Sequence, residues 1–174
     1  KAAFFDRDGV INYDYGYVHK FKDFKFMKGV IRSLKFLIKQ NYYIFIVTNQ
    51  AGIAKKIFTI NDLFVLHKNL KILLSKKNIN IDDVQFSPYH REGKVKRFIK
   101  NSNLRKPNNG MILNIMKKFK INKKNSFFIG DKYSDYLAAN KSNLQFEYVK
   151  KDLFYQVKTK IKKDEKKKII YFQS

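Results

Sequence analysis

The chain has 174 residues, of which 44% are hydrophobic, which is enough for one domain with a buried core and argues against a fibrous or disordered protein. It contains no cysteine, which excludes disulfides, thiolate metal sites and cysteine nucleophiles and is compatible with a reducing compartment. The 38 Lys and Arg residues against 14 Asp and Glu give a formal charge of +24, but the lysines are spread along the whole chain, so we interpret most of them as solvated surface positions and disfavour polyanion binding as the primary role.

Strand and helix patterns alternate along the chain. Continuous apolar runs bounded by turn residues predict buried strands, and apolar residues at spacings of three and four predict helices. In chain order we expect a strand at residues 2–5, an aromatic loop at 13–26, a helix at 29–40, a strand at 42–47, a helix from its cap Asn61 to about residue 77, a strand at 84–86, a polar loop at 87–109, a helix at 110–119, a strand at 126–129, a helix at 135–141 and a strand at 145–149.

This order predicts the fold class. Strands that alternate with helices form α/β folds, in which neighbouring parallel strands are connected through a crossing helix. We therefore predict an α/β, Rossmann-like, mainly parallel sheet with helices on both faces and no large cap domain. The domain is expected to span residues 1–156, followed by a basic C-terminal helix or tail at 157–170. Residues 171–174 resemble the remnant of a protease-site tag and are left out of the functional interpretation.

Three of the predicted strands end in polar residues. Two carboxylates that lie two residues apart, as in "DRD" at residues 6–8, repel each other unless a cation or a shared proton lies between them. Because the carboxyl ends of parallel strands meet at one edge of a sheet, the three groups are expected to converge. Together with "RKP" at 105–107 they supply a nucleophile, an acid, a hydroxyl, cations and metal-binding carboxylates, which phosphoryl transfer requires. The strand-end residues are Asp6 and Asp8, Thr48 and Asn49, and Asp131 and Asp135.

At these positions the sequence closely resembles the haloacid dehalogenase (HAD) superfamily of phosphohydrolases. The segment "DRDGVIN" is similar to its first motif, "VTN" to its second, Lys106 of "RKP" to its third and "GDKYSD" to its fourth. Within the superfamily, "YDYGYVH", "VTNQAGIA" and "RKPNNGM" look like the heptose-1,7-bisphosphate 7-phosphatases of nucleotide-heptose biosynthesis. Histidinol-phosphate phosphatases are close relatives, but the "GYVH" stretch favours the heptose enzymes.

The resemblance implies a covalent mechanism. Asp6 would attack phosphorus and form an aspartyl phosphate. Asp8 would protonate the departing alkoxide and later deprotonate the attacking water. Thr48 and Lys106 would hold the oxygens of the transferring phosphoryl group.

The resemblance also implies a magnesium site. Mg²⁺ would bind Asp6, Asp131 and the main-chain carbonyl of Asp8, which reduces the repulsion between an anionic nucleophile and an anionic phosphate. Asp135 is expected to orient Lys132 or a metal-bound water rather than to bind the metal directly.

The loops are expected to determine substrate preference. By resemblance, residues of two loops would line the sugar site, and two cations would bind the phosphate that stays on the substrate, because a guanidinium fork suits phosphate oxygens. Aromatic packing over the sheet edge is an equally supported role for the tyrosines. His19 is interpreted as structural, and His67 has no evident partner in the sequence. The expected substrate-binding residues are Arg7, Asp14, Tyr15, Gly16, Tyr17, Asn49, Gln50, Ala51, Arg105 and Lys132.

One segment departs from the family pattern. Relatives carry a zinc loop, with ligands in the pattern C-x-H followed by C-x-C just before "RKP", whereas the corresponding residues here are Ser87, Tyr89, Ser102 and Leu104. Hydroxyl and aliphatic groups are poor zinc ligands, so we predict no bound zinc. The loop would then be either mobile or held by apolar packing of Phe86, Phe98, Ile99 and Leu104.

The expected partner is therefore a small sugar phosphate, with Mg²⁺ as cofactor, bound by a monomeric cytoplasmic enzyme. The sequence shows no apolar segment of membrane-spanning length, no signal-peptide pattern and no coiled-coil seam. Three alternatives stay open: a phosphatase of histidinol phosphate, a phosphatase of nucleic-acid 3′ ends, and a basic protein that binds nucleic acid without catalysis. The last would lose affinity steeply with salt.

Overall fold

A computed structural model describes residues 1–173, with side chains described up to residue 165. Its centre is a five-stranded sheet in the order β3-β2-β1-β4-β5, and every neighbouring pair is parallel. The predicted α/β class is thereby confirmed. The strands are β1 (Ala2–Phe5), β2 (Tyr43–Asn49), β3 (Asp83–Ser87), β4 (Phe127–Gly130) and β5 (Gln145–Tyr148).

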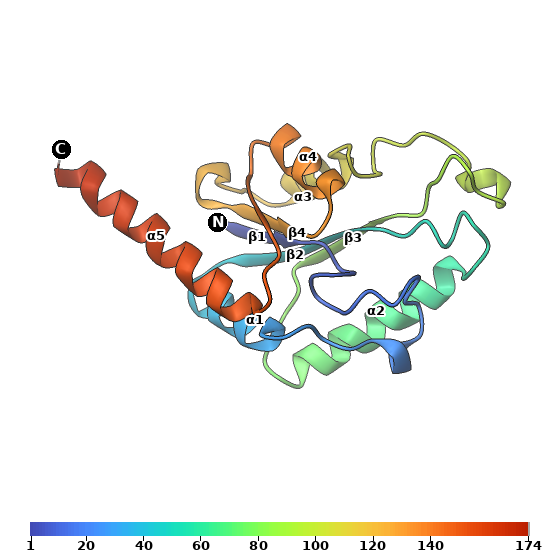
Figure 1. Cartoon of the computed structure of the whole chain (residues 1–174), viewed down its shortest axis with the longest axis horizontal. Coiled ribbons are helices and arrows are strands. Elements are labelled where there is room, and N and C mark those ends of the chain that lie inside the picture. Colours follow the sequence, from blue (N-terminus) through green and yellow to red (C-terminus); the bar gives the residue numbers. More distant parts are fainter. Residues whose placement is uncertain (174) are drawn as a thin grey trace.

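Helices cover both faces of the sheet, as predicted. Figure 1 shows α1, α2 and α5 on one face and α3 and α4 on the other. The described chain inserts no cap domain between these elements; long loops lie over the carboxyl ends of the strands instead. The helices are α1 (Val30–Lys39), α2 (Ile60–Ser75), α3 (Gly110–Lys118), α4 (Tyr133–Lys141) and α5 (Leu153–Gln173), with short 3-10 helices at Phe21–Asp23, Lys96–Phe98 and Lys123–Asn125.

The central strand β1 is buried on both sides. Ala3 and Phe5 pack into the core that also contains Leu34 of α1, while Phe4 lies in the opposite core with Ile112 of α3. Successive side chains of a strand point to opposite faces, so a strand covered on both faces must be apolar at every position. This is why "AAFF" ends abruptly where the chain leaves the sheet and meets the first aspartate.

The start of α2 differs from the prediction. The cap is Thr59, not Asn61: the Thr59 hydroxyl accepts a hydrogen bond from the Asp62 backbone N–H at 3.1 Å, and the Asp62 carboxylate accepts one from the Thr59 backbone N–H at 2.7 Å. This reciprocal pair satisfies two donors of the first helical turn, an arrangement that a single side chain at position 61 cannot provide.

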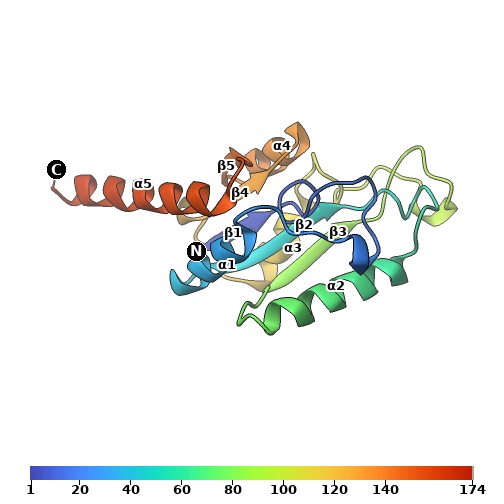
Figure 2. The same ribbon diagram turned by 60° about the horizontal axis from the view of Figure 1, so that its bottom comes forward.

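The predicted domain boundary at residue 156 falls inside α5. The helix is continuous from Leu153, and Val157 and Ile161 are buried in the core beside α1, so the domain extends into the basic segment predicted as a helix or tail. Figure 2 shows the later part of α5 leading away from the sheet. Residues 171–174, interpreted as a tag remnant, lie outside the residues whose side chains are described. Among the described residues, no helix combines the length and apolar character needed to cross a bilayer.

Candidate active site

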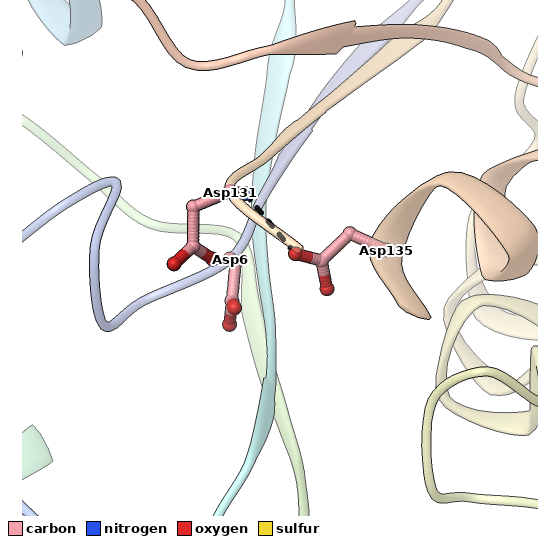
Figure 3. A group of neighbouring side chains, drawn as sticks. All are labelled: Asp6, Asp131 and Asp135. Carbon is pink, nitrogen blue, oxygen red and sulfur yellow. Dashed lines mark hydrogen bonds between the residues drawn. The ribbon is translucent and has the colours of Figure 1, made fainter. Parts of the chain in front are cut away.

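Three carboxylates converge where β1 and β4 end. Asp6 follows β1 and donates its backbone N–H to the Ile129 carbonyl at 3.1 Å, which continues the pairing of the two strands. Asp131 follows β4, and Asp135 lies on the first turn of α4. One carboxylate oxygen from each of these residues lies within 4.8 Å of the others (Figure 3). Strand pairing therefore places residues 125 positions apart next to each other.

Two glycines make room for this cluster. Gly9 has φ of 86°, and a Cβ there would lie 2.5 Å from the Asp131 Oδ2 atom. A Cβ on Gly130 would overlap the Asp135 side chain. Both positions need glycine for close approach, and Gly9 needs it also for its left-handed backbone conformation.

Lys106 is the buried cation of the cluster. Its Nζ lies 2.8 Å from Asp6 Oδ1 and 2.6 Å from Asp135 Oδ1, and it donates to the Val47 carbonyl at 2.9 Å. Burial opposes its charge, but Asp6 and Asp135 outweigh that effect and raise its pKa above the ordinary value. The Asn49 side chain holds the Lys106 backbone at both its N–H and its carbonyl, at 3.0 and 2.9 Å.

The carboxylates fit a hard divalent cation. Burial raises the pKa of Asp6 to about 7, even though Lys106 opposes the shift, and burial also raises the pKa of Asp131. Among the residues whose side chains are described, the buried Asp131 Oδ1 atom has no hydrogen-bond partner. Crowded carboxylate oxygens with one of them unpaired suit Mg²⁺. Asp135 differs, because its Oδ2 already accepts from the backbone N–H groups of Asp131 and Lys132 at 3.1 and 2.9 Å.

Asp8 lies in a different environment from Asp6. Its carboxylate accepts five hydrogen bonds from three side chains. Arg7 donates through Nε and Nη2, Asn12 through Nδ2 at 3.0 Å, and Gln50 through Nε2 at 2.8 Å. The same Gln50 amide also donates to the Thr48 hydroxyl at 2.8 Å, so it links the acid/base candidate to a phosphate-binding candidate.

Arg7 is not where a substrate-binding residue would lie. Its side chain is fully buried, and Arg7 is absent from the lining of the cavity that contains Asp6 and Lys106. The guanidinium is occupied by Asp8, His67, Gln50 and the Val18 carbonyl. The prediction of substrate contact for Arg7 is therefore corrected: the charge of Asp8 draws the guanidinium inward.

A cavity of about 540 Å³ opens above these groups, within the size range of small-molecule sites. It contains most of the predicted substrate residues, whereas Tyr15 is 60% exposed and packs on Tyr13 outside it. Arg105 and Lys132 both line it, as expected of cations that would bind a second phosphate. The lining residues are Asp6, Asp8, Asp14, Gly16, Tyr17, Thr48, Asn49, Gln50, Ala51, Arg105, Lys106, Pro107, Lys132 and Ser134.

Several residues near the site were missed from sequence. Asn12 closes the "DRDGVIN" segment and contacts Asp8, so its place in the motif was an available signal. Ser134 lies within "GDKYSD" and lines the cavity. Lys55 donates to the Tyr17 hydroxyl at 3.1 Å, and His67 contacts Arg7. No local pattern predicts the role of Lys55 or His67, because the residue that each one contacts is distant in sequence. His19 stacks on the Phe58 ring at 4.9 Å, which agrees with a structural role.

The loop that replaces the zinc segment is held by apolar contacts. Phe98 is buried in a cluster with Ile53 and Phe58, and Phe86 and Tyr89 pack against it. Leu104 packs against the core beside α3, whereas Ile99 is 43% exposed and outside the clusters. Apolar packing, rather than mobility, is thus the alternative that the contacts favour. Within the described part of the chain, the buried Ser87 hydroxyl has no hydrogen-bond partner.

A second hollow of about 610 Å³ lies at the opposite edge of the sheet, between residues 38–43 and 75–82. It is slightly larger than the cavity at the carboxyl edge. Of its described lining residues, Asp82 alone carries a carboxylate, which accepts a hydrogen bond from the Ile44 backbone N–H. Size alone therefore does not select the site; the clustered carboxylates and the lysine do.

Comparison with known sequences identifies relatives across most of the chain. Residues 1–167 match the family described as polynucleotide kinase 3 phosphatase (PNK3P). The D-glycero-beta-D-manno-heptose-1,7-bisphosphate 7-phosphatase of Haemophilus influenzae is 40% identical over 139 residues, which cover 80% of this chain and 75% of that protein. The protein of the same name from Escherichia coli K12 is 36% identical over 143 residues, which cover 82% of this chain and 75% of its own length.

Solved structures share the fold. A protein from Mesorhizobium loti described as a HAD-like phosphatase matches with a TM-score of 0.77 and 28% identity, covering 82% of this chain and 68% of that one. The D,D-heptose 1,7-bisphosphate phosphatase of B. bronchiseptica, solved with magnesium and phosphate, matches with the same TM-score at 20% identity and covers 92% of this chain and 87% of its own.

Proposed function

The chain belongs to the polynucleotide kinase 3 phosphatase family of HAD phosphatases, and on this premise we propose that it removes the 7-phosphate of D-glycero-D-manno-heptose 1,7-bisphosphate. The observation that carries the proposal is that Asp6 and Lys106, in contact at 2.8 Å, line a cavity that also contains Arg105 and Lys132, while the Asp131 carboxylate lies beside Asp6. One group of charges can bind the phosphate that is transferred, and the other can bind the phosphate that remains.

The first half of the reaction transfers the phosphoryl group to the protein. An Asp6 carboxylate oxygen attacks phosphorus while the bond between phosphorus and the sugar oxygen breaks, and the Asp8 carboxyl group gives its proton to that oxygen. Lys106 and Thr48 hold the phosphoryl oxygens as their charge develops. Because Lys106 already contacts Asp6 at 2.8 Å, it is in place before substrate binds.

The second half releases phosphate. A water molecule attacks the phosphorus of the aspartyl phosphate, Asp8 takes a proton from that water, and the bond to Asp6 breaks. The sum is sugar phosphate ester plus water giving alcohol plus inorganic phosphate, and the protein is restored. The Gln50 amide, which bonds both Asp8 and Thr48, orients the acid/base group toward the phosphoryl site.

The proposed cofactor is Mg²⁺, held by Asp6, Asp131 and the main-chain carbonyl of Asp8. When bound, it would neutralise charge so that an anionic nucleophile can meet an anionic phosphate. Asp135 would orient Lys132 and the metal site through the hydrogen bonds that its carboxylate accepts from the backbone N–H groups of Asp131 and Lys132.

The experiment that tests the function is a side-by-side assay of phosphate release with Mg²⁺. The substrates are heptose 1,7-bisphosphate, histidinol phosphate and a 3′-phosphorylated oligonucleotide. We expect the highest kcat/KM with the heptose and a large loss of that preference in Arg105→Ala, since this residue would bind the phosphate that stays. Equal turnover of all three substrates would reject the assignment.

Phosphate release from nucleic-acid 3′ ends is a second candidate. A hollow of about 500 Å³ adjoins the active-site cavity through Arg105 and Pro107 and is lined also by Arg91 and Lys100, so cations continue beyond the catalytic groups. A phosphodiester backbone would find charge there. If this candidate is correct, activity on the oligonucleotide exceeds that on the heptose and falls steeply with salt.

The proposal includes no zinc. The residues in the four ligand positions of the relatives are Ser87, Tyr89, Ser102 and Leu104, which form a poor donor set for that ion. Elemental analysis after dialysis should therefore find far less than one zinc per chain, and stoichiometric zinc would contradict this.

A cytoplasmic location and a monomeric state belong to the same proposal.

A further inference from the structure

Arg7 connects the acid/base candidate to a histidine on a distant helix. Its guanidinium donates from Nε and Nη2 to Asp8 Oδ1 at 3.2 and 2.9 Å, and from Nη2 to Asp8 Oδ2 at 2.8 Å. Its other terminal nitrogen, Nη1, lies 3.2 Å from His67 Nε2. Since a guanidinium is planar and rigid, a contact at Nη1 fixes the direction of the fork that holds Asp8.

His67 is able to accept that hydrogen bond. It lies in the middle of α2, is buried and has the Phe86 ring beside it at 6.4 Å. Burial and the neighbouring Arg7 lower its pKa to about 3, so the ring is neutral near pH 7. A neutral imidazole has one acceptor nitrogen, and with Arg7 facing Nε2 that nitrogen is the acceptor.

We propose that His67 is a positioning residue for catalysis: by accepting from Arg7 it fixes the guanidinium that orients the Asp8 carboxyl group toward the leaving oxygen. This inference rests on the proposed phosphatase function and adds to it a residue that does not line the active-site cavity. His67 acts through Arg7 and touches neither substrate nor metal site.

The arrangement of Arg7 supports more than a packing role. Arg7 is fully buried, although an arginine is seldom buried without a partner. Its remaining contacts, with the Val18 carbonyl at 2.7 Å and Gln50 Oε1 at 3.2 Å, come from two further segments. The guanidinium is thus held from α2, the residue 18 segment and the end of β2, so the orientation of Asp8 depends on a frame outside its own loop.

The experiment separates orientation of a proton donor from general stability. General acid catalysis matters for a poor leaving group such as a sugar alkoxide and little for p-nitrophenolate, which leaves without a proton. The ratio of kcat/KM on heptose 1,7-bisphosphate to kcat/KM on p-nitrophenyl phosphate therefore reports on Asp8. We compare wild type with His67→Leu, His67→Gln and His67→Asn, all with saturating Mg²⁺.

His67→Leu removes the acceptor and should lower kcat on the sugar phosphate about tenfold, with KM and the activity on p-nitrophenyl phosphate within about twofold of wild type. In His67→Gln the amide oxygen reaches the place of Nε2, so activity should return to within about twofold of wild type. The shorter His67→Asn should behave like leucine. Leu70→Ala is the matched control: Leu70 is a buried apolar residue of the same helix that cannot accept a hydrogen bond, so its loss should leave the ratio unchanged.

Two outcomes would overturn the inference. One is an equal loss on both substrates, which would indicate a purely structural role; the other is equal behaviour of the glutamine and asparagine variants. If His67→Leu does not fold, the Gln and Asn pair still decides. If wild type ignores the heptose but hydrolyses another alkyl phosphate, the proposed function fails, while the same ratio on that alkyl phosphate still tests His67.

Discussion

The two aspartates of "DRD" are separated by one residue but lie in opposite surroundings. Asp6 is crowded by the carboxylates of Asp131 and Asp135, and its charged partner is a lysine shared with Asp135. Asp8 is held by five hydrogen bonds from Arg7, Asn12 and Gln50. One short motif can thus supply two carboxyl groups with different properties. Neighbouring carboxylates and burial change the protonation of Asp6, whereas hydrogen-bond donors fix the orientation of Asp8.

The largest expected effect comes from the crowded side, by which we mean the carboxylates of Asp6, Asp131 and Asp135. Asp6→Asn keeps the shape of the side chain but removes the nucleophilic oxygen, so kcat should fall by at least about 10⁴-fold. The measurement is phosphate release on the best substrate, with circular dichroism to verify the fold. A variant with wild-type turnover would mean that no covalent intermediate forms on residue 6.

The next effect comes from the oriented side, by which we mean Asp8 and the residues that hold it, including Arg7 and, through Arg7, His67. Asp8→Asn removes the proton donor and should lower kcat/KM on an alkyl phosphate by about 10²- to 10⁴-fold. The loss on p-nitrophenyl phosphate should be much smaller, because that leaving group needs no proton. Equal losses on the two substrates would show that Asp8 does not act as the general acid.

A third effect concerns acid stability of the oriented side. The pKa of His67 is about 3 in the folded chain against an ordinary 6.5. Between these pH values the unfolded chain binds a proton at this histidine and the folded chain does not. The stability contributed by the neutral ring is complete above pH 6.5 and is lost as the pH falls toward 3. At pH 5 the free energy of unfolding of wild type should have fallen about 2 kcal/mol more than that of His67→Gln.

Urea unfolding of both proteins between pH 7 and pH 5 measures this difference. Because the two chains differ only at residue 67, the difference between their stability curves reports on that residue. Parallel stability curves would contradict a buried, neutral histidine.

The smallest effect is on metal binding at the crowded side. A Cβ at Gly9 would press on Asp131 Oδ2, so Gly9→Ala should raise the Mg²⁺ concentration for half-maximal activity roughly tenfold. Gly16→Ala is the matched control: its φ is also positive, at 79°, but its Cβ would meet no atom within 4 Å. A similar Mg²⁺ requirement in both variants would separate Gly9 from the metal site.

The sequence predicts the crowded side better than the oriented side. Asp6 and Asp131 each follow an apolar run, and parallel strands that end at one edge bring such residues together whatever lies between them. The sheet and four of the helices, α1 to α4, follow from the same apolar patterns. The resemblance to the HAD superfamily then suggests a role for each strand-end residue.

The oriented side depends on contacts that no local pattern encodes. An arginine is normally exposed, so a substrate contact was the expectation for Arg7, and its partner His67 lies 60 residues away. The core positions of α5 are hidden in the sequence for a related reason: Val157 and Ile161 lie beside or within a lysine-rich run, and packing against α1 shows that they are core.

Two hydrogen bonds between the Asn49 side chain and the Lys106 backbone make the position of the lysine independent of the loop that precedes it. Lys106 belongs to a loop, but its position is set by β2, because the side-chain amide of Asn49 forms hydrogen bonds with both the N–H and the carbonyl of Lys106. The composition of residues 88–104 should therefore have little effect on where Lys106 lies. A loop built on aromatic packing is thereby compatible with the same lysine position.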